Sequence, residues 1–419
     1  MSELSYLEKL LDGVEVEWLP LGEITKYEQP TKYLVKAKDY HDTYTIPVLT
    51  AGKTFILGYT NETHGIYQAS KAPVIIFDDF TTANKWVDFD FKAKSSAMKM
   101  VTSCDDNKTL LKYVYYWLNT LPSEFAEGDH KRQWISNYSQ KKIPIPCPDN
   151  PEKSLAIQSE IVRILDKFSA LTAELTAELT AELNMRKKQY NYYRDKLLNF
   201  KDIAGGGNCI LPGIMDDIRV EWKTLGEIAV IYDGTHKTPK YTASGVPFVS
   251  VQNIKNLYGT NKYISPEDFK TYKNKPRKHD LFMTRIGDVG TCAIVEDDRP
   301  LAYYVTLALI RINQQIAVPG FIRYLIESRF GKAELYKRTL IHAVPMKINL
   351  GEIGKVAVPI PCPDNPEKSL AIQSEIVRIL DKFDTQTNSI TEGLPREIEL
   401  RQKQYEYYRD LLFSFPKHP

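Results

Sequence analysis

Apolar residues recur at helical spacing over two long stretches of the chain. Between residues 150 and 200 they fall three or four apart, and leucines recur every fourth residue through three copies of Thr-Ala-Glu-Leu at 172–183. This period excludes a strand, and Ala, Glu and Leu favour helix, so the pattern predicts one helix of about 50 residues. Residues 366–415 predict a second helix of the same length, with a kink or break at Gly393 and Pro395.

The stretch before each long helix alternates short apolar runs with turn residues, which predicts strands, and also holds one amphipathic run typical of helix. Each stretch therefore predicts a mixed α/β domain. The expected strands are residues 46–49, 54–57 and 73–80 in the first stretch and 246–251, 280–286 and 291–296 in the second, and the expected helices are 108–119 and 320–337.

A long amphipathic helix cannot bury its apolar stripe alone, so we expect the two long helices to pair as an antiparallel coiled-coil spacer. This predicts an α+β protein in which two mixed α/β domains are joined by the helices with pseudo-two-fold symmetry. The alternative is that each helix packs only on its own domain. The expected boundaries are 1–147 and 214–362 for the domains, 148–200 and 363–415 for the helical spacers, and 201–213 for a Gly-rich linker.

The chain repeats itself in part. Residues 144–168 return unchanged at 359–383, and the segment MRKKQYNYYRD from Met185 returns as LRQKQYEYYRD from Leu400. A weaker echo opens each half, VEWLPLGEI from Val16 and VEWKTLGEI from Val220, whereas residues 25–143 and 229–358 share no obvious pattern. A plain duplication would have drifted evenly, although a recent duplication without functional meaning remains the alternative. The pattern favours variable parts that are exchanged and constant parts that make the same contact twice. We therefore expect the constant blocks to dock two equal partners, through Gln158, Ile161, Arg163, Gln373, Ile376 and Arg378.

Composition narrows the class of protein. Apolar residues make up 43% of the chain and charged residues 26%, which is normal for a soluble globular protein. The sequence has no apolar run of membrane-spanning length, no visible secretory signal and no Cys-x-x-Cys pair among its five cysteines, so we expect a cytoplasmic protein without a metal site or disulfides.

Catalytic motifs are missing. Ala51–Thr54 resembles the end of a P-loop, but Pro47 stands where its first glycine should be. Metalloprotease, nucleophile-elbow, amino-methyltransferase and Rossmann patterns are also absent. The sequence therefore indicates a chain that binds rather than reacts. Residues 214–358 hold 21 Lys and Arg against 15 Asp and Glu, a net charge of +6 that suits a polyanionic partner.

The chain resembles the DNA-specificity subunits of Type I restriction–modification systems over essentially its whole length. Both domains end in a similar Ile-Pro motif, Ile143–Pro146 and Val358–Pro361, followed by the repeated helix. In the second domain, Gly234–Pro239 matches the family's Gly-Thr-x-x-Thr-Pro loop and Arg285–Gly290 its later glycine turn. The first domain lacks that loop. The Thr-Ala-Glu-Leu copies resemble those of the IC subgroup.

The resemblance implies a non-catalytic subunit whose two target-recognition domains each read one half of a split, asymmetric DNA site. Two modification subunits would bring S-adenosylmethionine and adenine N6-methylation, and two restriction subunits, where present, would bring ATP- and Mg-dependent translocation and cleavage. The runner-up is a stand-alone bipartite DNA-binding regulator. A third possibility is an enzyme with an unrecognised site.

Direct reading of base pairs needs Arg or Lys for guanine and Asn or Gln for adenine, and phosphate contacts need cations. Loop residues of these types are the candidates, although many such residues are only solvated surface. They are Gln29, Lys53, Asn84, Lys85, Lys92, Lys94, Arg132 and Gln133 in the first domain, and Thr235, His236, Lys237, Thr238, Gln252, Asn253, Lys278 and Arg285 in the second.

Overall fold

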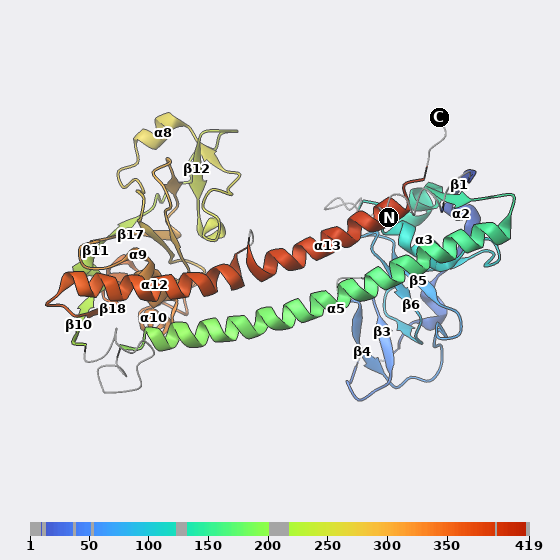
Figure 1. Ribbon diagram of the computed structural model, residues 1–419, viewed down its shortest axis with the longest axis horizontal. Helices are drawn as coiled ribbons and strands as arrows, with labels where there is room; N and C mark the ends of the chain where they lie inside the picture. Colours follow the sequence, from blue (N-terminus) through green and yellow to red (C-terminus); the bar gives the residue numbers. More distant parts are fainter. Residues whose placement is uncertain are drawn as a thin grey trace. The chain divides into compact units, whose positions relative to one another are not determined.

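The computed structural model describes residues 10, 14–36, 39–51, 54–122, 132–200, 218–389 and 392–415. It divides into two compact units, Met1–Glu178 with Ile398–Pro419, and Leu179–Glu397. Two helices, α5 (Pro151–Leu197) and α13 (Gly393–Leu412), have residues in both units (Figure 1). The expected Gly-rich linker lies outside the described residues.

The first unit contains two sheets and a closing strand pair. The pair is β1 (Val16–Pro20) with β9 (Lys142–Pro146), antiparallel. One sheet has the order β2-β8-β5-β6 and the other β4-β3-β7. The strands are β2 (Thr25–Glu28), β3 (Ile46–Leu49), β4 (Ile56–Thr60), β5 (Val74–Asp78), β6 (Asn84–Val87), β7 (Lys92–Ala93) and β8 (Met98–Ser103), and the helices are α2 (Leu21–Ile24), η1 (Pro30–Tyr33), α3 (Leu111–Leu118), α4 (Gln133–Ser136) and η2 (Tyr138–Gln140).

The second unit repeats this plan. Its closing pair is β10 (Val220–Thr224) with β18 (Ala357–Pro361), and its sheets have the orders β11-β17-β14-β15 and β13-β12-β16. The strands are β11 (Ala229–Asp233), β12 (Val246–Val249), β13 (Tyr263–Ile264), β14 (Leu281–Thr284), β15 (Cys292–Ile294), β16 (Ala302–Tyr303) and β17 (Leu307–Ile312), and the helices are α7 (Leu225–Ile228), η3 (Val251–Asn253), α8 (Pro266–Lys270), α9 (Pro319–Glu327), α10 (Arg329–Tyr336), α11 (Leu350–Gly354) and α12 (Pro366–Asn388).

The two variable domains thus share a topology although residues 25–143 and 229–358 share no obvious sequence pattern. In each, the central strand of the three-stranded sheet has one antiparallel and one parallel neighbour: β3 with β4 and β7, and β12 with β13 and β16. Backbone pairing carries this likeness, and backbone pairing tolerates many side chains. Both predicted α/β domains are confirmed.

Each unit holds segments of both long helices. In the first unit Phe168 of α5 stacks on Tyr408 of α13, with ring centroids 5.5 Å apart, and Ser169 Oγ donates to the Tyr405 hydroxyl at 3.1 Å. The contacts run in opposite directions along the two helices, so they are antiparallel there. In the second unit Tyr193 of α5 stacks on Phe383 of α12.

Each long helix also ends inside a hydrophobic core. Phe413 and Phe415, which follow α13, are buried in the core of the first unit. Leu197, Leu198 and Phe200, at the end of α5, are buried in the core of the second. The two predicted long helices are confirmed, and neither packs only on its own domain.

The predicted break in the second long helix is also confirmed. α12 ends at Asn388 and α13 begins at Gly393. Gly393 has a φ of +78°, and a Cβ there would lie 2.6 Å from the Thr385 carbonyl oxygen, so the residue suits glycine alone. One helix prediction was wrong: residues 320–337 form two helices, because the Ser328 hydroxyl accepts from Gly331 N at 3.1 Å and caps a new one.

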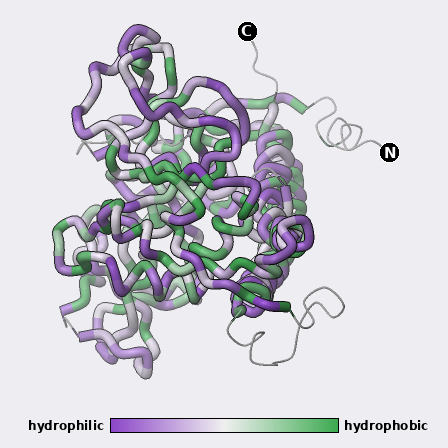
Figure 2. The backbone as a smooth tube through the Cα atoms, turned by 90° about the vertical axis from the view of Figure 1, so that its left-hand side faces the viewer, coloured by the Kyte–Doolittle hydropathy of each residue, from purple (hydrophilic) through white to green (hydrophobic). Residues whose placement is uncertain are grey.

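Hydrophobic residues recur at intervals along the backbone rather than in one continuous stretch, as Figure 2 shows. Among the described residues, no helix has both the length and the apolar character needed to cross a membrane.

Candidate nucleic-acid interface

The identical blocks join each domain to its helix through the same hydrogen bonds. Gln158 is fully buried; its Oε1 accepts from Leu110 N at 2.9 Å and its Nε2 donates to Lys108 O at 3.0 Å. Gln373 makes the equivalent bonds, from Val318 N at 2.9 Å and to Ile316 O at 3.1 Å. Leu110 and Val318 are the N-cap residues of α3 and α9, so each glutamine holds the start of its domain's helix.

A tyrosine–aspartate hydrogen bond completes the contact between each domain and its helix, which we call the joint. The Tyr116 hydroxyl donates to Asp166 Oδ1 at 2.5 Å, and the Tyr324 hydroxyl donates to Asp381 Oδ1 at 2.6 Å. Burial, and then the bond to the carboxylate, raise the pKa of Tyr116 and of Tyr324 well above the usual range, so both phenols stay protonated and donate. The domain partners of both glutamines are backbone atoms, which any sequence supplies, whereas Asp166 also accepts from the Lys112 side chain of α3 at 2.9 Å.

These contacts change the view of the expected docking residues. Gln158, Gln373, Ile161 and Ile376 are fully buried inside their own units, so they offer no surface to a partner and the structure corrects that expectation. Arg163 and Arg378 face outward, with side chains 51% and 56% exposed, and each pairs with a glutamate one turn earlier in its helix. The repeat indicated one contact made twice, but much of that contact is internal.

The Gly-Thr-x-x-Thr-Pro loop of the second domain begins where β11 ends and packs against Tyr304, the residue that follows β16. A Cβ on Gly234 would overlap the carbonyl group of Tyr304 and lie 2.8 Å from Val305 N, which explains the glycine. Thr235 bridges to Tyr304 through the backbone, and its Oγ1 accepts from Lys237 N at 3.3 Å. The loop therefore presents His236, Lys237 and Thr238 as exposed side chains.

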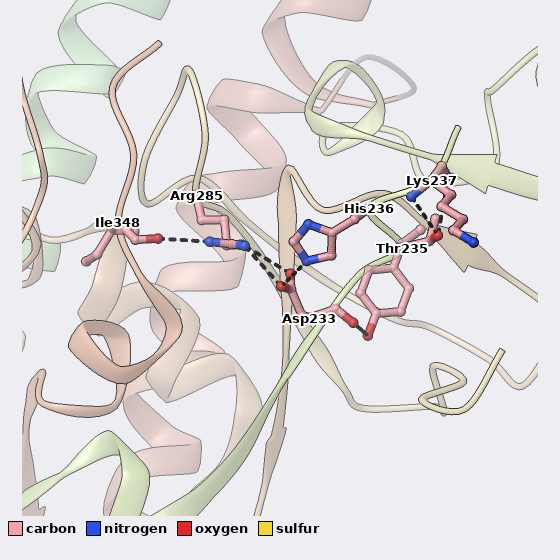
Figure 3. Close-up of polar contacts among 7 residues, drawn as sticks. Asp233, Thr235, His236, Lys237, Arg285 and Ile348 are labelled. Atoms are coloured by element: carbon pink, nitrogen blue, oxygen red, sulfur yellow. Dashed lines mark hydrogen bonds and ion pairs between the residues drawn. The ribbon is translucent and has the colours of Figure 1, made fainter. Parts of the chain in front are cut away.

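Asp233, the last residue of β11, joins two of the predicted residues. Arg285 Nη2 donates to its two carboxylate oxygens at 3.0 and 3.2 Å, and His236 Nε2 lies 2.8 Å from Oδ2 (Figure 3). Arg285 Nη1 also donates to Ile348 O at 3.1 Å. The Arg285 side chain is only 8% exposed, so it positions Asp233 rather than facing a ligand.

A groove of about 260 Å³ lies beside this loop. It brings together Thr238 and Gln252, two of the predicted residues, with three aromatic rings and a lysine that sequence reasoning missed. Lys262 Nζ sits 5.4 Å from the centroid of the Tyr241 ring. The lining residues are Thr238, Tyr241, Phe248, Ser250, Val251, Gln252, Lys262, Tyr304 and Thr306.

Two further candidates in this domain lie differently. Asn253 Oδ1 accepts from Ser250 N at 3.1 Å, so its side chain caps the short helix η3 and is used internally. Lys278 is exposed, and its backbone N–H donates to Asp298 Oδ1 at 2.9 Å. Its side chain remains a candidate for a phosphate contact.

In the first domain an aspartate replaces the arginine. Asp79 directly follows β5, as Arg285 follows the corresponding strand β14. Asp79 is 1% exposed, and it accepts from Gln133 N through its carbonyl oxygen and from Trp134 N through Oδ1, both at 2.8 Å. It therefore holds the start of α4, with Arg132 Nη1 at 4.0 Å and the buried Lys99 Nζ at 3.5 Å from Oδ2.

The other candidates of this domain divide by exposure. Lys92 is 3% exposed, donates to His64 O at 2.6 Å and pairs with Glu62 at 2.8 Å, so its charge is used internally and the structure does not support a DNA contact. Lys85 and Lys94 are exposed, and Gln29 and Asn84 are partly exposed. Lys53 lies outside the described residues.

Among the described residues, no cluster of His, Cys, Asp and Glu could hold a metal ion. A family model for the Type I restriction modification DNA specificity domain matches the chain twice, over residues 13–185 and 219–400. The chain belongs to this family.

Two curated relatives agree with this assignment. The EcoR124I/EcoR124II specificity subunit of Escherichia coli is 63% identical over 433 aligned residues, covering 100% of this chain and 98% of the relative. The EcoprrI specificity subunit of Escherichia coli is 35% identical and covers 94% and 93%. A solved structure described as the basis of complex assembly and conformational transition of the type I R-M system shares the fold, with a TM-score of 0.53, 16% identity and coverage of 95% and 97%.

The protein is therefore a Type I specificity subunit, a non-catalytic component that recognises a DNA target within a restriction–modification complex.

Proposed function

We propose that each variable domain of this specificity subunit reads one half of a bipartite DNA site, with 1–147 and 214–362 as the two target-recognition domains. The observation that carries the proposal is the repeated joint. Two domains of one topology are fixed to their helices by the same Gln and Tyr–Asp bonds, yet they present different side chains. The same domain–helix contact, used twice to hold two different reading surfaces, suits an asymmetric site.

In the second domain the proposed reading surface is the loop Gly234–Thr238 with the adjoining groove. Gln252 can pair with adenine, the aromatic rings offer apolar contact to a thymine methyl, and Lys237, Lys262 and Lys278 can neutralise phosphates. In the first domain the proposed surface comprises Arg132, Gln133, Asn84 and Lys85, around the turn from β5 to β6, together with Gln29 and Lys94. Mapping the methylated site for variants of each surface tests the assignment.

The subunit would dock two modification subunits, which bind S-adenosylmethionine and methylate adenine N6, and two restriction subunits, where present, would bind ATP and Mg. The exposed face shared by both constant blocks supports equal partners, because Arg163 and Arg378 have the same ion pair and similar exposure.

Reversing the charge of Arg163 and Arg378 together, as Arg163→Glu with Arg378→Glu, is expected to weaken assembly with the modification subunit at least tenfold. The substitution removes two equal positive charges from the proposed docking face, and the new carboxylates would repel Glu160 and Glu375. Co-purification and titration calorimetry measure the effect. Arg299→Glu is the matched control, since that side chain is 61% exposed and ion-paired but lies outside the blocks. Equal affinity for the double variant and wild type would remove both arginines from the interface.

Deleting one Thr-Ala-Glu-Leu copy, Thr180–Leu183, is expected to shorten the unread gap between the half-sites by one or two base pairs. Four residues of helix span about 6 Å, and B-DNA rises about 3.4 Å per base pair. Methylation mapping gives the gap and both half-sites together. Thr180→Ala keeps the helix length and should leave the gap unchanged. A deletion variant with an altered half-site would contradict the role of α5 as a ruler.

A further inference from the structure

His236 is held through one ring nitrogen and open at the other. We propose that His236 is a specificity-determining residue that accepts a hydrogen bond from the amino group of an adenine or cytosine, and that Asp233 sets its tautomer. The proposal rests on the proposed DNA interface of the second domain.

The tautomer follows from the partner of Nε2. His236 Nε2 lies 2.8 Å from Asp233 Oδ2, and both oxygens of that carboxylate also accept from Arg285. An ionised carboxylate has lone pairs and no proton to donate, so the hydrogen between the two groups belongs to Nε2. In a neutral ring Nδ1 then carries a lone pair and can only accept.

Nδ1 is free to meet DNA. The His236 side chain is 70% exposed, and no described residue makes a hydrogen bond to Nδ1. Figure 3 shows the second ring nitrogen pointing away from Asp233. In the major groove adenine and cytosine present amino donors, whereas the hydrogen-bonding groups of guanine and thymine there are acceptors. An acceptor at Nδ1 therefore favours adenine or cytosine at one position.

The ring is anchored from behind. The Tyr303 hydroxyl donates to Asp233 O at 3.1 Å, and Arg285 ties the Asp233 carboxylate to Ile348 O. Burial first, and then the charge of Asp233, raise the pKa of Tyr303, so its phenol stays a donor. Asp233 is thus a positioning residue. Lys237, which follows His236 in the chain, is the cation suited to a phosphate contact.

The test begins with the full chain assembled with its modification subunit and a mapped target site. Each adenine or cytosine of the second half-site is replaced in turn by purine or 2-pyrimidinone, which lack the amino group. Affinity is measured for wild type and for His236→Ala, an exposed loop variant that should fold. One position should show a loss of about three- to tenfold in wild type and almost none in the variant.

Three results would overturn the proposal. One is the absence of any position whose amino-group penalty shrinks in His236→Ala. Another is a uniform loss of affinity on all sequences with a lower salt dependence, which marks a phosphate contact. The third is a mapped site without a second specific half, and this result alone would also refute the proposed function of the domain. In Asp233→Asn the amide can donate to Nε2, which then carries no proton. The ring proton would sit on Nδ1, which could no longer accept, so this variant should lose the same single-position preference.

Discussion

Replacing Gln158 with alanine is expected to lower the free energy of unfolding of the first unit by about 2–5 kcal/mol. The side chain is fully buried, and its loss leaves Leu110 N and Lys108 O without their partner and opens a cavity beside α3. Because Gln373 makes the same bonds in the second unit, Gln373→Ala should have a similar effect there. Chemical denaturation with amide hydrogen exchange locates each loss in its unit.

Ser159→Ala is the matched control for Gln158→Ala. Ser159 is the next residue along the same helix and is exposed, so its replacement should change the unfolding free energy by less than about 0.5 kcal/mol. If Gln158→Ala were as mild as this control, the buried joint would not hold the recognition domain on its helix.

Replacing Gly234 with alanine is expected to reduce binding of the second half-site at least tenfold and to cost about 1–3 kcal/mol of stability. The added methyl would overlap the carbonyl carbon and oxygen of Tyr304. These two atoms belong to the backbone, so they cannot rotate away as a side chain could. The loop would have to move, and Asp233, His236 and the groove would lose their register. Electrophoretic mobility shifts on duplexes with either half-site changed separate this effect from general loss of binding.

Gly351→Ala provides the control for this substitution. Gly351 lies in α11 of the same unit, and a Cβ there meets nothing within 4 Å. Its replacement should keep DNA binding and leave stability equal or slightly raised, since alanine favours helix. Unchanged half-site binding by Gly234→Ala would show that the loop does not contact DNA.

The architecture was largely predictable because it follows from periodicity. The leucine repeat predicts α5, and Gly393 with Pro395 predicts the break between α12 and α13. The split between α9 and α10 was missed, because the apolar spacing continues across Ser328 and only the cap reveals the new helix. The shared strand order within residues 25–143 and 229–358 was not predicted, since strand pairing by backbone leaves little trace in side chains.

The candidate site was predictable only in part. The loop motif led to His236 and Thr238, and Gln252 proved to line the groove with Thr238. Other candidates were wrong because they are buried. Gln158 and Lys92 are residue types usually found at the surface, yet both are enclosed by partners distant in sequence. Asp233 and Asp79 were missed because single carboxylates give no signal until the structure shows what they hold.

The most direct test of the central claim is methylation mapping. The chain would be co-expressed with a Type I modification subunit, and the host genome read for N6-methyladenine. We predict one bipartite motif with a fixed gap, one half of which changes when His236 and Gln252 are replaced and the other when Gln133 and Lys85 are replaced. A soluble complex that methylates no motif, while the chain alone binds DNA selectively, would contradict this account and favour a stand-alone DNA-binding regulator.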